Sequence, residues 1–207
     1  MSMSIKTCLA AAALTFTVGI FSASAADLSA SDIRLVRQSR TSLYAAIQMA
    51  EKATAGATFD AFSTVDGGKL VFTVVVHSGD QVLEVKVDAK AAKIISKAGK
   101  GPVASYIDGD GDEAIDLSGM KRPLIEAAKT AEISLKGRAV GAEFKADKGK
   151  TEFVVLVANA RNVLTAVTID AATGTIITDK AAMIPEAAAK QKTASAGQLD
   201  DNDGDAN

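Results

Sequence analysis

The chain has 207 residues, of which 48% are hydrophobic and 4% aromatic, and its formal net charge is −2. This length supports one compact domain or two small ones, with cores built mainly from Val, Ile, Leu and Ala. A nucleic-acid-binding protein neutralises phosphates with clustered Lys and Arg, which we do not find here, so a general nucleic-acid binder is disfavoured.

The first 25 residues are typical of a secretory signal peptide. Lys6 precedes the apolar stretch Cys8–Ile20, and Ala23-Ser24-Ala25 forms a small-residue cleavage pattern. The apolar stretch is too short to span a bilayer comfortably. Cleavage after Ala25 leaves 22 basic and 25 acidic residues and no cysteine, so we expect a periplasmic protein without disulfides and without a membrane span.

A first domain is predicted for residues 28–98, and it begins with a helix. Apolar residues recur at helical spacing from Ile33 to Ala50. Ser29 and Asp32 form a capping pair in front of them, and Gly56 is a natural stop. We therefore expect one helix between the capping pair and the glycine.

An antiparallel meander is predicted after this helix. Two turn signals, Asp66-Gly67-Gly68 and His77-Ser78-Gly79-Asp80, separate runs of β-branched residues. The predicted strands are residues 57–65, 69–76 and 81–89. A sheet of three or four strands with one apolar face needs a cover, which the helix provides.

Residues 99–119 are expected to form an acidic linker, which ends in the sequence "YIDGDGDEAIDLSG". Counted from Asp108, the pattern matches a calcium loop of the EF-hand kind at positions 1, 3, 5, 8 and 9, but it has Glu113 at position 6 and Gly119 at position 12. A hard cation needs six to eight oxygen ligands, and glycines let successive carboxylates converge. The candidate ligands are Asp108, Asp110, Asp112, Glu113 and Asp116; a solvated linker is the alternative.

A second domain is predicted for residues 120–181, and it repeats the plan of the first. Residues 43–83 align with residues 124–164 at a constant offset of 81, and the match resumes at an offset of 82 after one inserted residue. The second helix is expected from Pro123 to Ala131. The strands after it are expected at residues 138–146, 151–159 and within 162–178.

The segment from residue 185 to residue 207 is expected to be a flexible acidic tail, because it contains few large apolar residues. It repeats the Asp-x-Asp-x-Asp spacing of the linker, with Asp201, Asp203 and Asp205 as further candidate metal ligands. Acidic tails also serve as solubilising devices, and that interpretation is favoured for a terminal segment without a scaffold.

Both copies end in a way that resembles the PepSY domain, with an alternating strand, an Asp-Ala pair and a turn before a short apolar strand. Asp170-Ala171-Ala172-Thr173-Gly174 matches this ending, whereas Asp88-Ala89-Lys90-Ala91-Ala92 lacks the glycine, so its turn is expected to differ in φ. The resemblance implies an α+β fold in tandem, each copy a helix packed on a small antiparallel sheet. It also implies an accessory module without catalytic residues, related either to peptidase inhibition or to the lanthanide-binding two-PepSY type.

The residues that remain offer no catalytic arrangement. His77 is the one histidine and is expected as a polar turn residue, and no Gly-x-Ser-x-Gly elbow is present. Zinc and copper are disfavoured because nitrogen and sulfur ligands are lacking. The leading hypothesis is a non-enzymatic periplasmic protein that binds a lanthanide ion or Ca²⁺. The alternative is a PepSY-type peptidase inhibitor or protein-interaction module with a periplasmic protein partner.

Overall fold

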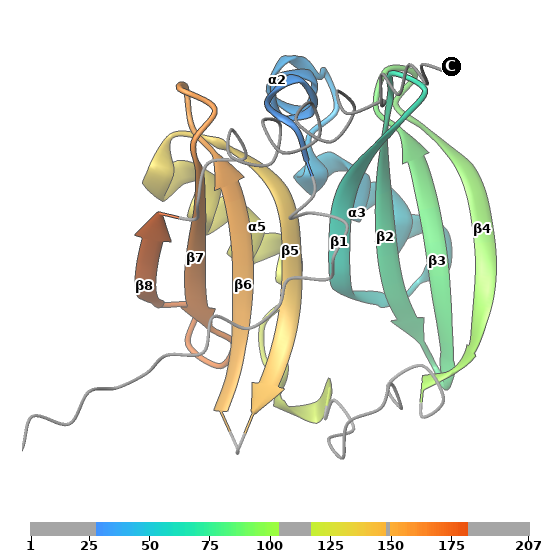
Figure 1. The fold of residues 1–207 in the computed structure, drawn as a ribbon. Helices are drawn as coiled ribbons and strands as arrows, with labels where there is room; N and C mark the ends of the chain where they lie inside the picture. The colour runs from blue at the N-terminus through green and yellow to red at the C-terminus, as the bar shows by residue number, and fades with distance from the viewer. Residues whose placement is uncertain (1–27, 104–116, 148–149, 182–207) are drawn as a thin grey trace, which may run out of the picture.

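The computed structural model describes residues 28–103, 117–147 and 150–181 of the chain (Figure 1). Within these residues the first half contains two helices followed by four strands, and the second half contains a 3-10 helix and an α-helix followed by four strands. In chain order the elements are α2 (Ala30–Gln38), α3 (Leu43–Thr54), β1 (Ala57–Asp66), β2 (Lys69–Ser78), β3 (Gln81–Asp88), β4 (Lys93–Pro102), the 3-10 helix η1 (Leu117–Gly119), α5 (Leu124–Leu135), β5 (Arg138–Asp147), β6 (Lys150–Ala158), β7 (Leu164–Asp170) and β8 (Ile176–Ala181).

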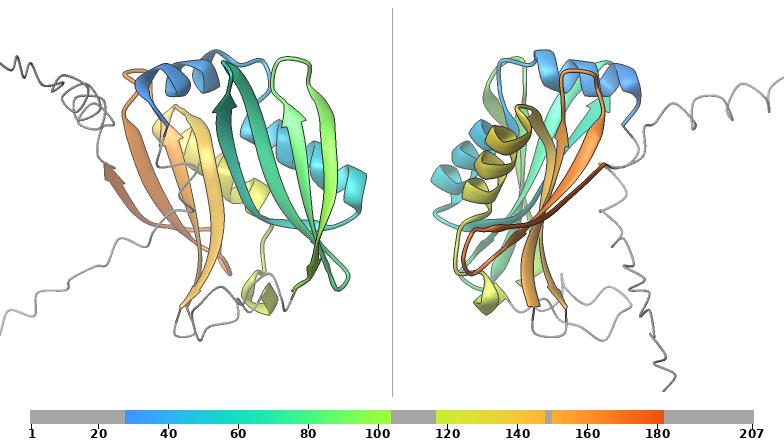
Figure 2. Two further views of the ribbon diagram at one scale, coloured as in Figure 1. Left: turned by 45° about the vertical axis from the view of Figure 1, so that its right-hand side comes forward. Right: turned by 90° about the vertical axis from the view of Figure 1, so that its left-hand side faces the viewer.

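The eight strands form one antiparallel sheet in the order β4-β3-β2-β1-β5-β6-β7-β8. Each half of the chain is a meander, and the two meanders meet where β1 pairs with β5. Figure 2 shows α3 and α5 lying together on one face of this sheet. The α+β class expected from the sequence is confirmed, and both halves contribute to a single sheet; the division into two domains stays a prediction.

The main core lies between the sheet and the two helices α3 and α5. Apolar side chains of α3 and α5 pack against inward-facing residues of the strands, because successive strand residues point to opposite faces. Phe72 of β2 and Phe153 of β6, which are equivalent in the two halves, are both buried. Burying such a side chain contributes about 1.5–3 kcal/mol, so these positions anchor the helix layer.

A second apolar cluster lies on the other face, under α2. Ile33 and Val36 of α2 pack with Val140, Leu156 and Leu164. The helix predicted between residues 29 and 56 is therefore wrong in one respect, because the structure has two helices with a break at residues 39–42. The apolar spacing was compatible with a continuous helix, but the two pieces bury their apolar residues on opposite faces of the sheet.

Local hydrogen bonds explain the break and confirm the predicted capping pair. Ser42 accepts a hydrogen bond from the Ala45 amide at 3.1 Å and so starts α3 as its N-cap. Ser29 and Asp32 form a reciprocal capping box at the start of α2, with N–O distances of 3.0 and 3.2 Å. A serine therefore determines where α2 and α3 begin, whereas α5 follows Pro123 without a side-chain cap.

α3 ends just before Gly56, as expected, whereas α5 runs from Leu124 to Leu135 and ends four residues later than the expected end at Ala131. The left-handed residue is Ala55 in the first half (φ 52°) and Lys136 in the second (φ 48°), and the glycines follow them. Gly56 and Gly137 are needed for space, because a Cβ at either position would collide with backbone and valine atoms of β2 or β6. Each glycine therefore allows the end of its helix to lie close to the sheet.

The turns after β3 and β7 are alike, which corrects the expectation that the first would differ in φ. Ala92 has φ 50° and Gly174 has φ 76°, so both residues are in the left-handed conformation. This conformation is unfavourable for alanine but not for glycine. Asp88 and Asp170 each accept hydrogen bonds from the second and third following amides at 2.7–3.0 Å. These amide bonds hold the pKa of each carboxyl below its ordinary value.

Candidate functional site

The candidate metal ligands lie outside the described residues, so their assignment stays a prediction. The segment between residues 103 and 117 is bounded by residues that the structure does place. The Val103 amide donates to the Asp80 carbonyl at 2.8 Å, and Gly119 lies against the Thr151 side chain. Figure 1 shows the end of β4 and η1 at the same end of the sheet. The residues concerned are Asp108, Asp110, Asp112, Glu113, Asp116, Asp201, Asp203 and Asp205.

Within the described residues no group of three or more His, Cys, Asp or Glu side chains is arranged to hold a metal ion. Asp88 and Asp170 lie at opposite ends of the sheet, and each caps its own turn. His77 belongs to β2 and pairs with Ala57 and Val82, so its placement in the hairpin turn was wrong. The turn is the two residues Gly79 and Asp80, because the ladder continues to Ser78.

Two carboxylates face each other where the halves of the sheet meet. Asp60 of β1 pairs with Glu143 of β5, on the face where the adjacent Phe62 packs with the α2 cluster. Glu143 also forms an ion pair with Lys145 at 2.9 Å. Burial, followed by the charge of Glu143, raises the pKa of Asp60 to about 7, although the Ala61 amide opposes this. This carboxyl therefore titrates near neutral pH.

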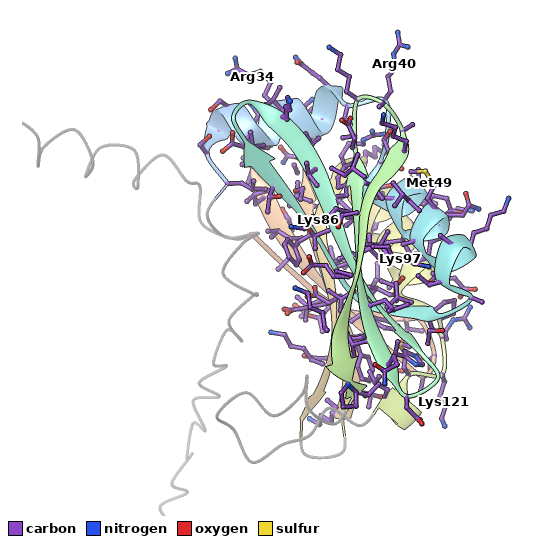
Figure 3. All side chains as sticks on the ribbon, turned by 90° about the vertical axis from the view of Figure 1, so that its right-hand side faces the viewer. Arg34, Arg40, Met49, Lys86, Lys97 and Lys121 are labelled. Atoms are coloured by element: carbon purple, nitrogen blue, oxygen red, sulfur yellow. The ribbon has the colours of Figure 1, made fainter. Side chains whose placement is uncertain are left out.

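Basic side chains gather on the outer hairpin β3–β4, a feature that the sequence analysis missed. Lys86, Lys90, Lys93, Lys97 and Lys100, which we name the basic strip, occur within residues 81–102 together with two acidic residues, Glu84 and Asp88. The hairpin thus carries a net charge of +3 on a chain of net charge −2. Figure 3 looks onto this edge of the sheet, with Lys86 and Lys97 labelled.

Glu84 occupies the inner side of the basic strip. Its carboxylate lies 2.8 Å from the Lys100 ammonium and 3.6 Å from that of Lys86. Burial alone would raise the pKa of Glu84, but these two lysines hold it below its ordinary value. The charge of Glu84 is therefore engaged by the strip itself. Lys90, Lys93 and Lys97 are exposed. Lys93 lies opposite Asp88 and Lys97 opposite the buried Val85, so Lys93 and Lys97 project from opposite faces of the hairpin.

The edge strand β4 is built against pairing with another strand. Its register along β3 shifts twice, at the bulged residues Ile95 and Lys100. Bulges and lysines on an edge strand both hinder the addition of a further strand. The side chains of this hairpin, rather than its backbone, are therefore the groups available for binding.

A small hollow lies between α5 and the strands β6 and β7. It is lined by Arg122, Glu126, Phe153 and Gly174 among others, and the Arg122 guanidinium donates to the Glu126 carboxylate at 2.7 Å. The guanidinium stacks over Gly174, where a Cβ would meet its Nε at 2.9 Å. This ion pair fixes the start of α5 against the turn after β7, and the hollow presents no activated nucleophile or base.

Comparisons with known proteins give a family for part of the chain. The model described as "Peptidase propeptide and YPEB domain", PepSY, matches residues 42–98. No curated protein matches the chain. A crystal structure from Clostridium difficile 630, described as a "putative lipoprotein", is 18% identical and covers 70% of this chain and 97% of its own, with a TM-score of 0.41. No helix among the described residues is long and apolar enough to cross a membrane. A PepSY domain therefore lies within residues 42–98, from the N-cap of α3 into β4.

Proposed function

We propose that this protein is a non-catalytic interaction module of the cell envelope that binds an acidic, extended segment of a partner polypeptide on the basic strip. The main observation that supports this proposal is the net charge of +3 on the β3–β4 hairpin, in a chain that is acidic elsewhere. The PepSY match supports an accessory role, since it covers this hairpin up to residue 98 and indicates no catalytic family.

The strength of such binding depends on several lysines acting together. Exposed ion pairs contribute at most about 1 kcal/mol each, so the three exposed lysines Lys90, Lys93 and Lys97 supply roughly 1.5 kcal/mol, or about tenfold in affinity. The Debye length shortens from about 20 Å to about 7 Å between about 20 mM and about 200 mM salt, so the affinity falls steeply over that range. Specificity beyond charge would come from apolar contact with Ile95, which is 49% exposed.

The test is a titration with a fluorescent peptide of about fifteen residues that alternates Glu with apolar residues. Replacing Lys90, Lys93 and Lys97 with Gln is expected to weaken binding about tenfold. The matched control replaces Lys52, Lys121 and Lys129, which are also exposed but lie elsewhere, and so changes the net charge equally. An equal loss in both triple variants would show that only net charge matters, and it would reject the strip as the site.

A second candidate function is the binding of a hard cation, favoured by the repeated Asp-x-Asp-x-Asp spacing at residues 108–112 and 201–205. Carboxylate oxygens suit Ca²⁺, and a trivalent lanthanide of similar size gains more Coulomb energy from the same charges. Calorimetric titration with La³⁺ and with Ca²⁺ at physiological ionic strength tests it. The Asn variant at Asp108, Asp110 and Asp112 should lose most tight binding; unchanged affinity would reject this site.

We also propose that residues 122–180 are a second copy of the PepSY-like unit. Structural details recur at the sequence offset of 81: Glu51 accepts from the Thr58 amide at 3.1 Å, and Glu132 accepts from the Ala139 amide at 2.8 Å. The strand bulges follow the same spacing. Ala61 pairs with Ala142, which is its own equivalent, so the copies meet about a local twofold axis, as in an isologous dimer.

A further inference from the structure

The arginines of this chain gather at one end of the sheet, whereas its lysines occur along the whole chain. Five of the six arginines belong to α2, to the residues just after it or to the segments that it contacts: Arg34, Arg37, Arg40, Arg138 and Arg161. Arg161 precedes β7, while the amide of the sixth, Arg122, donates to the Ala171 carbonyl after β7. The sixth arginine therefore lies at the opposite end.

Two of the five arginines hold α2 in place across this end. Arg37 donates to the Asn162 side chain at 2.7 Å, in the turn after β6, and Arg138 of β5 donates to the Ser39 carbonyl at 2.7 Å. The Ser39 hydroxyl donates to the Ala89 carbonyl, just after β3, at 3.4 Å. Figure 2 shows α2 lying across the sheet here. From β3 to β6 there are four strand spacings of about 4.8 Å, so this charged end is about 19 Å wide and exceeds a single phosphate or carboxylate.

The other three arginines face outward. Arg34, Arg40 and Arg161 are exposed, and among the residues that the structure describes they form no ion pair with a carboxylate. Figure 3 shows Arg34 and Arg40 together at the upper end of the molecule. Residues 30–42 and 159–163 contain four arginines and one aspartate, a net charge of +3. Three guanidinium groups are thus accessible to a broad anionic surface.

The chemistry of this end fits a planar surface rich in phosphate better than it fits a polypeptide. The guanidinium fork binds phosphate oxygens in a bidentate way. An extended polypeptide adds to a strand edge, but this end of the sheet presents turns and a helix. Leu35, beside Arg34, is 37% exposed on the side of α2 that faces away from its buried residues. An apolar side chain among cations suits the boundary between headgroups and acyl chains of a bilayer.

We propose that the arginine end, which we define as Arg34, Leu35, Arg40 and Arg161, docks this protein on a bilayer that contains anionic phospholipids. Each Lys or Arg held close to such a surface strengthens binding about fivefold, so three arginines contribute about hundredfold. β4 runs from this end of the sheet to the other, so docking leaves most of the basic strip accessible to its partner. The inference therefore goes beyond the proposed function and does not depend on it.

Vesicle sedimentation tests the contact with the chain that begins after residue 25. Vesicles of phosphatidylcholine alone are compared with vesicles that also contain about 30% phosphatidylglycerol, at about 20 mM and about 200 mM salt. We expect binding only to the anionic vesicles, with most of it lost at high salt. The triple variant Arg34→Gln, Arg40→Gln, Arg161→Gln should bind about a hundredfold more weakly, whereas the triple lysine control described above should lose less than fivefold. No binding of the parent chain, or an equal loss in both variants, overturns the proposal.

A fluorophore reports which end meets the bilayer, because the chain after residue 25 contains no native cysteine. An environment-sensitive dye at Gln38→Cys on α2 should shift to shorter wavelength with anionic vesicles, and the same dye at Ala172→Cys, in the turn after β7, should not. Leu35→Ser should remove most of this shift and leave binding to soluble polyphosphate unchanged. A shift at Ala172→Cys, or a full shift in Leu35→Ser together with equally tight polyphosphate binding, rejects the bilayer; the latter result assigns a soluble polyanion instead.

Peptide titration separates this proposal from the proposed function. The triple arginine variant should bind the acidic peptide as tightly as the parent chain does, and an unchanged urea midpoint shows that it is folded. The variant at Lys90, Lys93 and Lys97 should lose peptide binding and still bind anionic vesicles. If the arginine variant lost peptide binding and vesicle binding to the same extent, an acidic polypeptide would replace the bilayer as the occupant of the arginine end. Loss of peptide binding in the lysine variant alone supports both proposals.

Discussion

Replacing Asp60 with Asn should change how the stability of this protein depends on pH. Asp60 faces Glu143 across the junction between β1 and β5, and its burial and that neighbouring charge raise its pKa from 3.8 to about 7. The unfolded chain loses this proton near its ordinary pKa, whereas the folded chain keeps it up to neutral pH. Folded protein therefore binds one proton more than unfolded protein between about pH 4 and about pH 7.

The sign and size of the effect follow from proton linkage. Where the folded state binds more protons, the free energy of unfolding falls as pH rises, by about 1.4 kcal/mol per pH unit for one proton. Three units of difference give about 4 kcal/mol; because the side chain is only half-buried, we expect about 2–4 kcal/mol. The loss begins near pH 4, is complete near pH 7 and does not grow above it.

Urea denaturation at steps between about pH 4 and about pH 8 measures this loss for the parent chain and for Asp60→Asn. The variant should gain stability relative to the parent as pH rises, by the amount calculated above. Asp88→Asn is the matched control, since its exposed carboxyl has a lowered pKa and titrates below this range. If the difference between parent and Asp60→Asn were constant with pH, the raised pKa and its structural cause would both be refuted.

Three further substitutions test local features by urea denaturation. Ala92→Gly should stabilise the protein by about 0.5–1 kcal/mol, because Ala92 has φ 50°, whereas Ala91→Gly in the same turn should destabilise it. Gly137→Ala should cost about 1–3 kcal/mol through collision with β6, and Gly99→Ala, which has no atom within 4 Å, should cost far less. Ser42→Ala should cost about 1 kcal/mol by removing the cap of α3. A reversed order within either matched pair, or an unchanged midpoint for the cap variant, would contradict these explanations.

The features that could be predicted from the sequence are those set by neighbours along the chain. Gly67 and Gly68 both have positive φ, and the hairpin signal that they give is local. The capping box of Ser29 and Asp32 also depends on residues three apart. Alternating burial in β3 reflects the two-residue period of a strand. These patterns were enough for the α+β class.

The features that could not be predicted depend on contacts between distant segments. Three residue pairs join β1 to β5, and no local period in either strand selects the other as partner. Asp60 and Glu143 therefore look like two unrelated acids in the sequence. The basic strip is not evident in the sequence because its lysines are three or four residues apart, and only the pairing of β3 with β4 brings them into one hairpin. The excess of lysines over acidic residues within residues 81–102 is the sequence feature that indicates this hairpin.

The junction between β1 and β5 also bears on how the protein unfolds. It contains three residue pairs, against nine between β1 and β2, so few backbone hydrogen bonds cross from one half to the other. Cooperativity between the halves must then come largely from side chains: those of α3 and α5, where the two helices pack together, and those of α2 against Val140, Leu156 and Leu164. A loss of packing at both contacts would uncouple the halves, so that one half opens while the other stays folded.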